Sequence, residues 1–144
     1  MSDVSHGMVI GEVSRLARVK SATIRYYEGV GLLPLPPRTQ GNRRTYSTSD
    51  VQRLKFIRHA RELGFDLEAI RQLLALAGLP EEPCDGADAI ARAHLSGVED
   101  RIARLVALRG ELKAMVDQGS HGRIAECRVI EVLANHGECL ADTH

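Results

Sequence analysis

Three cysteines, Cys84, Cys127 and Cys139, are the residues of this 144-residue sequence best suited to chemistry. An odd number of thiols does not indicate the disulfide framework of a secreted protein. In a reducing compartment such cysteines are buried side chains, metal ligands or reactive thiols. Thiolate together with imidazole is a donor set for zinc, cadmium or lead, and thiolate alone suits mercury. Imidazoles for such a site are available nearby at His121, His136 and His144.

A second group of residues suits contact with DNA. Arg25, Tyr26 and Tyr27 are consecutive; arginine can bind guanine or phosphate in a bidentate manner, and tyrosine can donate its hydroxyl to phosphate. Because neighbours on a helix point about 100° apart, one of the two tyrosines can instead belong to the core. The candidate DNA contacts are Arg18, Lys20, Thr23, Arg25, Tyr26, Tyr27, Arg38, Asn42, Arg43, Arg44, Tyr46 and Arg53.

Two short helices are predicted to position these residues. The segment 9–19 has apolar residues at helical spacing, and the next segment predicts a short helix with Ser21 as its cap and Ile24 facing inward. Gly29 or Gly31 would end this second helix. Two short helices joined within a few residues predict a helix-turn-helix.

A wing is predicted after the helix pair. The segment 34–47 is rich in Pro, Gly and polar residues, which indicates an extended loop or short hairpin. Arg43 and Arg44 lie beside its Gly-Asn turn, where a basic loop would meet the DNA backbone. Tyr46 would either anchor the wing or reach a phosphate.

Two further helices follow the wing. The first covers about 49–64, is capped by Ser47 or Ser49 and is ended by Gly64. The second covers 68–78. The apolar face of the first is predicted to contain Val51, Leu54, Phe56, Ile57 and Leu63.

A long helix is predicted at 87–118, because apolar residues recur there at steps of three or four. The resulting stripe is too narrow to be buried against a globular core, so a coiled-coil dimer, parallel or antiparallel, is the simplest way to cover it. The stripe contains Leu95, Val98, Ile102, Leu105, Leu108, Leu112 and Met115.

The two ends of this helix separate two of the cysteines. A helix of this length measures about 48 Å, so Cys84 and Cys127 cannot meet within one chain unless the helix breaks. In an antiparallel dimer, Cys84 of one subunit would approach Cys127 of its partner, which gives two equivalent sites per dimer.

The charge is divided between the two halves of the chain. The formal net charge is zero, but residues 1–80 have twelve Lys and Arg against seven Asp and Glu, and residues 81–144 have seven against twelve. The basic half suggests a polyanionic partner. The chain contains no apolar run of about 20 residues and begins without a signal-peptide pattern, so we expect a cytoplasmic protein without a membrane partner.

The runs TIRYYEGVGLLPLPPR and GNRRTYSTSDVQRLKFIRHARELGFDLEAI together resemble the MerR family of metal- and stress-responsive regulators. The resemblance implies a mainly α-helical fold. Its parts would be a winged helix-turn-helix DNA-binding domain at 8–78, an antiparallel coiled-coil dimerisation helix at 85–118 and an effector segment at 119–144. It also implies a homodimer that binds promoter DNA and acts on RNA polymerase.

The same resemblance assigns metal ligands. Regulators of divalent soft metals have a cysteine at the position of Cys84, and Cys127 matches the second cysteine of the family's metal-binding loop. The first loop cysteine is missing, since its position falls at Gln118 or Gly119. Cys139 resembles a further cysteine of zinc-responsive members. The implied ligands of a divalent metal ion, zinc or else cadmium, lead or mercury, are Cys84, His121 in place of the missing cysteine, Cys127 and Cys139.

The leading functional hypothesis is a metal-responsive regulator. By resemblance, it would bind a pseudo-palindromic promoter and activate transcription by distorting the DNA when metal binds. The missing loop cysteine keeps an alternative open, in which a thiol on the same scaffold senses aldehydes, nitric oxide or oxidants. An enzyme is not expected, because the sequence has no Gly-rich phosphate loop, paired catalytic carboxylates or HExxH motif.

Overall fold

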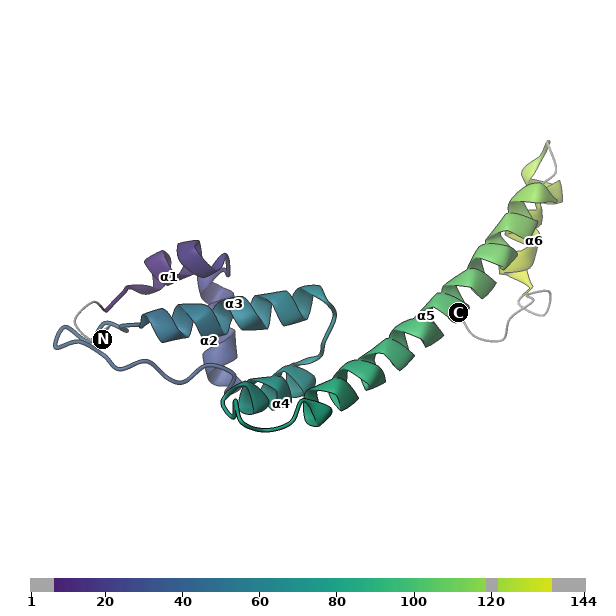
Figure 1. Ribbon diagram of the computed structural model, residues 1–144. Helices are drawn as coiled ribbons and strands as arrows, with labels where there is room; N and C mark the ends of the chain where they lie inside the picture. The colour runs from purple at the N-terminus through teal and green to yellow at the C-terminus, as the bar shows by residue number, and fades with distance from the viewer. Residues whose placement is uncertain (1–6, 119–121, 136–144) are drawn as a thin grey trace. The chain divides into compact units, whose positions relative to one another are not determined.

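The computed structural model describes residues 7–118 and 122–135, and these residues form two compact units that meet between Ile90 and Ala91. The fold is mainly helical, as predicted; within the described ranges, strand pairing is limited to two isolated β-bridges. In the first unit α1 packs on α2 and on α3, and α3 packs on α4 (Figure 1). No helix in the described part of the chain is both long enough and apolar enough to cross a membrane.

The helix-turn-helix consists of α1 (Ile10–Ala17) and α2 (Ser21–Gly29). Arg18 ends α1 in the left-handed conformation, with φ of 58°, and thereby turns the chain into α2 within three residues. The prediction that Ser21 caps α2 is wrong: Lys20 is the N-cap, without a side-chain hydrogen bond, and Ser21 is already helical.

The predicted wing is a short hairpin. The backbone pairs Arg38 with Arg44 and, at the base, Met8 with Tyr46. Asn42 has a φ of 63° at the turn, where its N–H donates to the carbonyl of Thr39 over 2.9 Å. Asparagine tolerates this left-handed conformation better than most residues, which accounts for a polar residue at this position.

Helix α3 (Thr48–Glu62) is capped by Ser47, one of the two predicted candidates, Ser47 and Ser49. The Ser47 hydroxyl accepts from the Asp50 N–H at 3.2 Å, and the Asp50 carboxylate accepts from the Ser47 N–H at 3.0 Å, so the two residues form a capping box. Gly64, with φ of +88°, turns the chain after α3. Helix α4 (Leu67–Ala77) follows, capped by Asp66.

The core of the first unit lies between α1, α2, α3 and α4. Its fully buried side chains include Val13, Ile24, Leu54 and Ile57. Two residues predicted on the apolar face of α3 are more exposed than expected: Phe56 is 36% exposed and Leu63 is 69% exposed. The complete buried cluster contains Val13, Ala17, Val19, Ile24, Tyr27, Leu32, Leu33, Tyr46, Val51, Leu54, Ile57, Ala60, Ile70 and Leu74.

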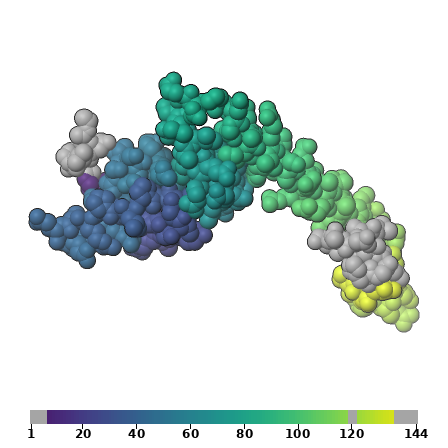
Figure 2. Space-filling view, turned by 90° about the horizontal axis from the view of Figure 1, so that it is seen from below, coloured from purple at the N-terminus to yellow at the C-terminus, as the bar shows by residue number. Residues whose placement is uncertain are grey.

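Helix α5 (Asp85–Asp117) begins two residues before the predicted start of the long helix and extends into the second unit. The second unit also contains a 3₁₀ turn, η2 (Ile124–Glu126), and α6 (Arg128–Ala134). Figures 1 and 2 both place α6 beside the last turns of α5. The apolar stripe of α5 is solvent-exposed along much of its length, including Leu95, Ile102, Leu105 and Leu112.

Candidate nucleic-acid interface and thiol ligands

Helix α2 presents a polar outer face. Arg25 is exposed and Tyr26 is 53% exposed, whereas Ile24 and Tyr27 are buried on the opposite side. The structure therefore places Tyr27, a predicted DNA contact, in the core, because it is three residues from Ile24 and shares its helix face. The two tyrosine rings still touch, with centroids 5.9 Å apart and planes at 53°, so the buried ring supports the exposed one.

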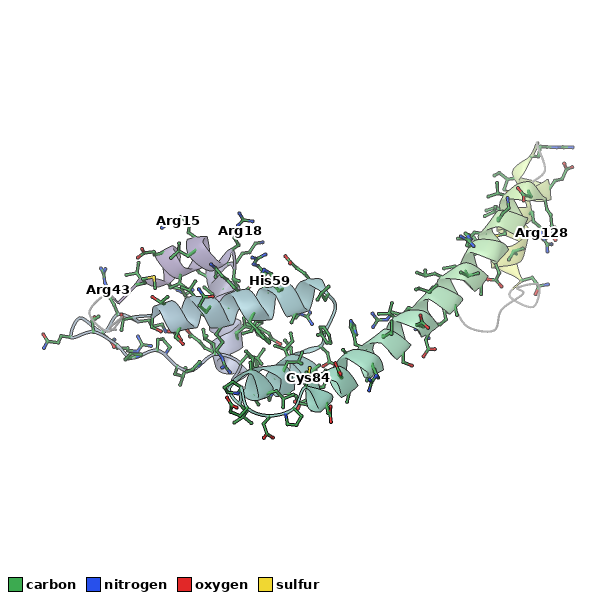
Figure 3. All side chains as sticks on the ribbon, viewed as in Figure 1. Arg15, Arg18, Arg43, His59, Cys84 and Arg128 are labelled. Carbon is green, nitrogen blue, oxygen red and sulfur yellow. The ribbon has the colours of Figure 1, made fainter. Side chains whose placement is uncertain are left out.

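The wing presents Arg43 to solvent. Figure 2 shows the wing projecting from the body of the first unit, and Figure 3 shows the Arg43 side chain pointing away from it. Arg38 is also exposed, and its Nη1 donates to the carbonyl of Asn42 over 3.1 Å, which stiffens the turn. An exposed arginine at the tip of a short hairpin is suited to reach a phosphate.

Three side chains join the wing to α2 beneath this surface. The Tyr46 hydroxyl donates to Glu28 Oε2 at 2.5 Å, and Arg44 Nη1 lies 3.3 Å from Glu28 Oε1 in an ion pair. Among the residues that the structure describes, Oε1 has this ion pair but no hydrogen-bond partner. Tyr46, which was predicted either to anchor the wing or to reach a phosphate, is only 2% exposed and joins the wing to α2 through this hydrogen bond.

Burial and the neighbouring carboxylate raise the pKa of Tyr46. Desolvation is the largest cause, followed by the hydrogen bond to Glu28 and its negative charge, and together they bring the pKa from 10.0 to about 12. The neutral phenol is therefore favoured in the folded state.

Tyr46→Phe should destabilise the protein by an amount that depends on pH. Because the folded pKa is raised, the contribution of the hydroxyl is fully present below pH 10 and is lost as the pH rises from 10 toward 12. We expect the difference between wild-type and variant unfolding free energies, measured by urea titration, to be constant from pH 7 to about 9 and to shrink above about 10. Tyr26→Phe removes an exposed hydroxyl as the control; a difference independent of pH in the Tyr46 pair would contradict the assignment.

Two arginines hold the chain after α2. Arg53 Nε donates to the carbonyl of Leu32 at 2.6 Å, and Arg71 Nη2 donates to the carbonyl of Val30 at 2.9 Å. Arg53 was a predicted phosphate contact; in the structure it is half-buried and supports the loop that leads to the wing.

A shallow basic hollow adjoins the start of α2. It is lined by four of the predicted contacts, Arg18, Lys20, Thr23 and the buried Tyr27, and by Arg58, Arg61 and Glu62 of α3, which were not predicted. Figure 3 shows Arg18 projecting from the end of α1. Arg58 Nε donates to the carbonyl of Ala17 at 3.0 Å, so it also fixes the end of α1. Arg58 and Arg61 lie one turn apart on α3, and this spacing could have predicted that they share one basic helix face.

Two of the cysteines predicted as metal ligands lie in different units. Cys84 directly precedes α5 and is exposed, with Sγ 3.9 Å from Asp88 Oδ1, and Cys127 is the half-buried N-cap of α6. Both are free thiols. The other predicted ligands, His121 and Cys139, lie outside the described residues, as do His136 and His144. Residues 7–118 and 122–135 do not bring three metal-ligating side chains together. Each thiol is chemically suited to a soft divalent metal, but neither unit provides a full site from its described residues.

The sequence matches two family models. Residues 8–77 match the model described as MerR HTH family regulatory protein, and residues 51–115 match the model described as MerR, DNA binding.

Individual relatives match over most of the chain. The HTH-type transcriptional regulator ZntR of Escherichia coli (strain K12) is 42% identical over 127 residues, which are 86% of this chain and 90% of the relative. The heavy metal-dependent transcription regulator 2 of Rhizobium meliloti (strain 1021) is 38% identical over 128 residues, 89% of this chain and 87% of the relative. Among solved structures, the transcription regulator PbrR691 from Ralstonia metallidurans CH34 in complex with lead(II) has a TM-score of 0.78 and 38% identity, and the match covers 88% of this chain and 98% of that one.

Proposed function

The chain belongs to the MerR HTH family of regulatory proteins, and from this membership we propose that it is a metal-responsive transcriptional regulator that binds promoter DNA as a homodimer. The observation that carries the proposal is the match, in sequence and in fold, to a regulator solved in complex with lead(II). The match covers both the DNA-binding unit and the long helix, so it supports similar roles for these two parts in this chain.

The DNA-binding surface consists of the outer face of α2 and the tip of the wing. Arg25 and Tyr26 of α2 enter the major groove, and Arg43 contacts the backbone beside it. The supporting observation is that these three side chains are exposed on one unit whose core is well buried. Further backbone contacts come from Arg18, Lys20, Thr23, Arg38 and Asn42.

Dimerisation covers the apolar stripe of α5. Leu95, Ile102, Leu105 and Leu112 are each more than half exposed in the single chain. A second copy of the helix, packed antiparallel as a coiled coil, removes these side chains from water at about 25 cal/mol for each Å² buried. The chain then divides into a DNA-binding domain at 8–78, a dimerisation helix at 85–118 and an effector segment at 119–144.

The metal ligands are Cys84 of one subunit and Cys127 of its partner, completed by His121 and Cys139. These side chains would hold the ion between the two subunits. Zinc is our first choice because mixed thiolate and imidazole donors suit it; cadmium, lead and mercury are alternatives. The similarity to heavy-metal-dependent regulators supports a metal ion as the signal, rather than modification of a thiol by aldehydes, nitric oxide or oxidants.

Activation follows from deformation of the promoter. The metal-loaded dimer holds its two DNA-binding units so that a pseudo-palindromic site is bent and untwisted, and RNA polymerase then uses a poorly spaced promoter. Many phosphate contacts can offset such a deformation, which costs a few kcal/mol.

The test uses the purified full-length protein and a promoter containing a duplex that it selects from a random pool. We expect zinc, cadmium, lead or mercury to raise transcription in vitro and a chelator to reverse the effect. If no metal changes transcription while a thiol-modifying reagent does, the metal proposal fails and the thiol alternative replaces it. If the protein selects no duplex, the DNA-binding proposal fails as well.

A further inference from the structure

We propose that Glu28 is a positioning residue that holds the wing at a fixed place relative to α2, and that Arg44 serves this attachment and does not contact DNA. The proposal rests on the DNA-binding function proposed above. It divides the adjacent arginines of the wing, Arg43 and Arg44, into two different roles.

The alternation of the hairpin separates the two arginines. Successive side chains of an extended strand point to opposite faces, so Arg44 and Tyr46 share one face and Arg43 belongs to the other. Both members of the first pair reach Glu28: the Tyr46 hydroxyl lies 2.5 Å from Oε2, and Arg44 Nη1 lies 3.3 Å from Oε1. Arg43 is exposed and points outward (Figure 3).

The burial of Glu28 makes these contacts difficult to replace. Its side chain is 2% exposed, against 29% for Arg44. A carboxylate in such a place needs partners within the protein, since water cannot solvate it. In the part of the chain that the structure describes, its two partners both come from the wing, 16 and 18 positions further along the chain. The wing therefore has one favoured docking position, the one that satisfies this carboxylate.

The position matters because α2 and the wing contact different parts of the same DNA. Glu28 and Tyr27 face inward on the helix whose outer face carries Arg25 and Tyr26. A rigid link from the inner face of α2 to the wing sets the spacing between the groove-reading side chains and Arg43. Binding constellations need to be held within about 0.5 Å to work well, and buried supporting contacts provide this precision.

The test is a double-mutant cycle on DNA affinity. The probe is the duplex that the wild-type full-length protein selects from a random pool, and the dissociation constant is measured at several salt concentrations. We expect Glu28→Gln and Arg44→Gln each to weaken binding about tenfold, with the double variant no weaker than either single one, because both remove the same link. Neither should change the slope of log affinity against log salt.

Arg43→Gln is the matched control, since it changes the neighbouring arginine of the same hairpin. It should lower the salt slope by about one phosphate contact, and its effect should multiply with that of Glu28→Gln. If Arg44→Gln lowers the slope as Arg43→Gln does and multiplies with Glu28→Gln, Arg44 is a backbone contact and the proposal is overturned. It is also overturned if folded Glu28→Gln binds as tightly as the wild type.

Folding is checked by circular dichroism before binding is measured. Should Glu28→Gln not fold, the cycle between Tyr46→Phe and Arg44→Gln replaces it, and additive effects there overturn the proposal. If the wild type selects no duplex, the proposed DNA-binding function itself is wrong. If the wild type selects a duplex but Glu28→Gln binds it with unchanged affinity, or if the effects in the replacement cycle are additive, only the positioning role is wrong.

Discussion

A mixed dimer of one Cys84→Ser subunit and one Cys127→Ser subunit should bind about half as much zinc as the wild type, although each variant alone binds none tightly. In an antiparallel dimer each site takes Cys84 from one subunit and Cys127 from the other. The mixed dimer then keeps one intact site and loses the other. The two free thiols are separated by α5, which has 33 residues and is therefore about 50 Å long, and this is why the subunits are expected to share the site.

The measurement requires differently tagged subunits, so that the mixed species can be purified by two successive affinity steps. Zinc bound per dimer is determined after dialysis, and promoter transcription is measured in parallel. A doubly tagged dimer with Cys84→Ser in both subunits is the matched control and should stay empty. Zinc binding by either single-variant homodimer at the wild-type level would show that its cysteine is not a ligand, and an empty mixed dimer would place the site within one subunit.

Leu54→Ala should destabilise the DNA-binding unit by about 3 kcal/mol, within the range of 2–5 kcal/mol observed for leucine truncation in cores. Leu54 is 0% exposed and lies in the cluster that joins α1, α2, α3 and α4. The loss of stability combines the free energy of burying the removed methyl groups, which is no longer gained, with the cost of the cavity that they leave. Urea unfolding followed by circular dichroism gives the free energy.

Leu63→Ala is the control for this substitution, because it is the same chemical change at a residue that is 69% exposed directly after α3. Its effect should be below about 0.5 kcal/mol. Similar effects at the two positions would mean that burial in the single chain does not govern stability here.

Much of the fold follows from local rules that the sequence displays directly. Ser47, one of the two predicted caps, begins α3, and the turn at Gly64 follows its end as predicted, since both features depend on residues within one turn of the helix end. The apolar repeat likewise predicted α5. The same reasoning failed at Ser21, because the preceding left-handed residue, Arg18, turns the chain so that Lys20 takes the cap position.

The buried link at Glu28 was not predicted, although part of its signal was present. Ile24, Tyr27 and Glu28 are spaced by three and four residues and so share one helix face. A carboxylate on an apolar face requires a partner, but local spacing cannot say which cation or hydroxyl provides it. The partners, Arg44 and Tyr46, become neighbours only when the wing folds back on α2.

The sequence by itself determined the helices, several of their ends, the family and the residue types available for DNA and metal, because these depend on contacts within a few residues or on patterns along one helix. Only the tertiary structure decided that Tyr26 faces outward while Tyr27 is buried, and that Arg43 is exposed while Arg44 is paired. Adjacent residues of the same type differ in role because burial depends on what the rest of the chain packs against them, and that is a property of the whole fold.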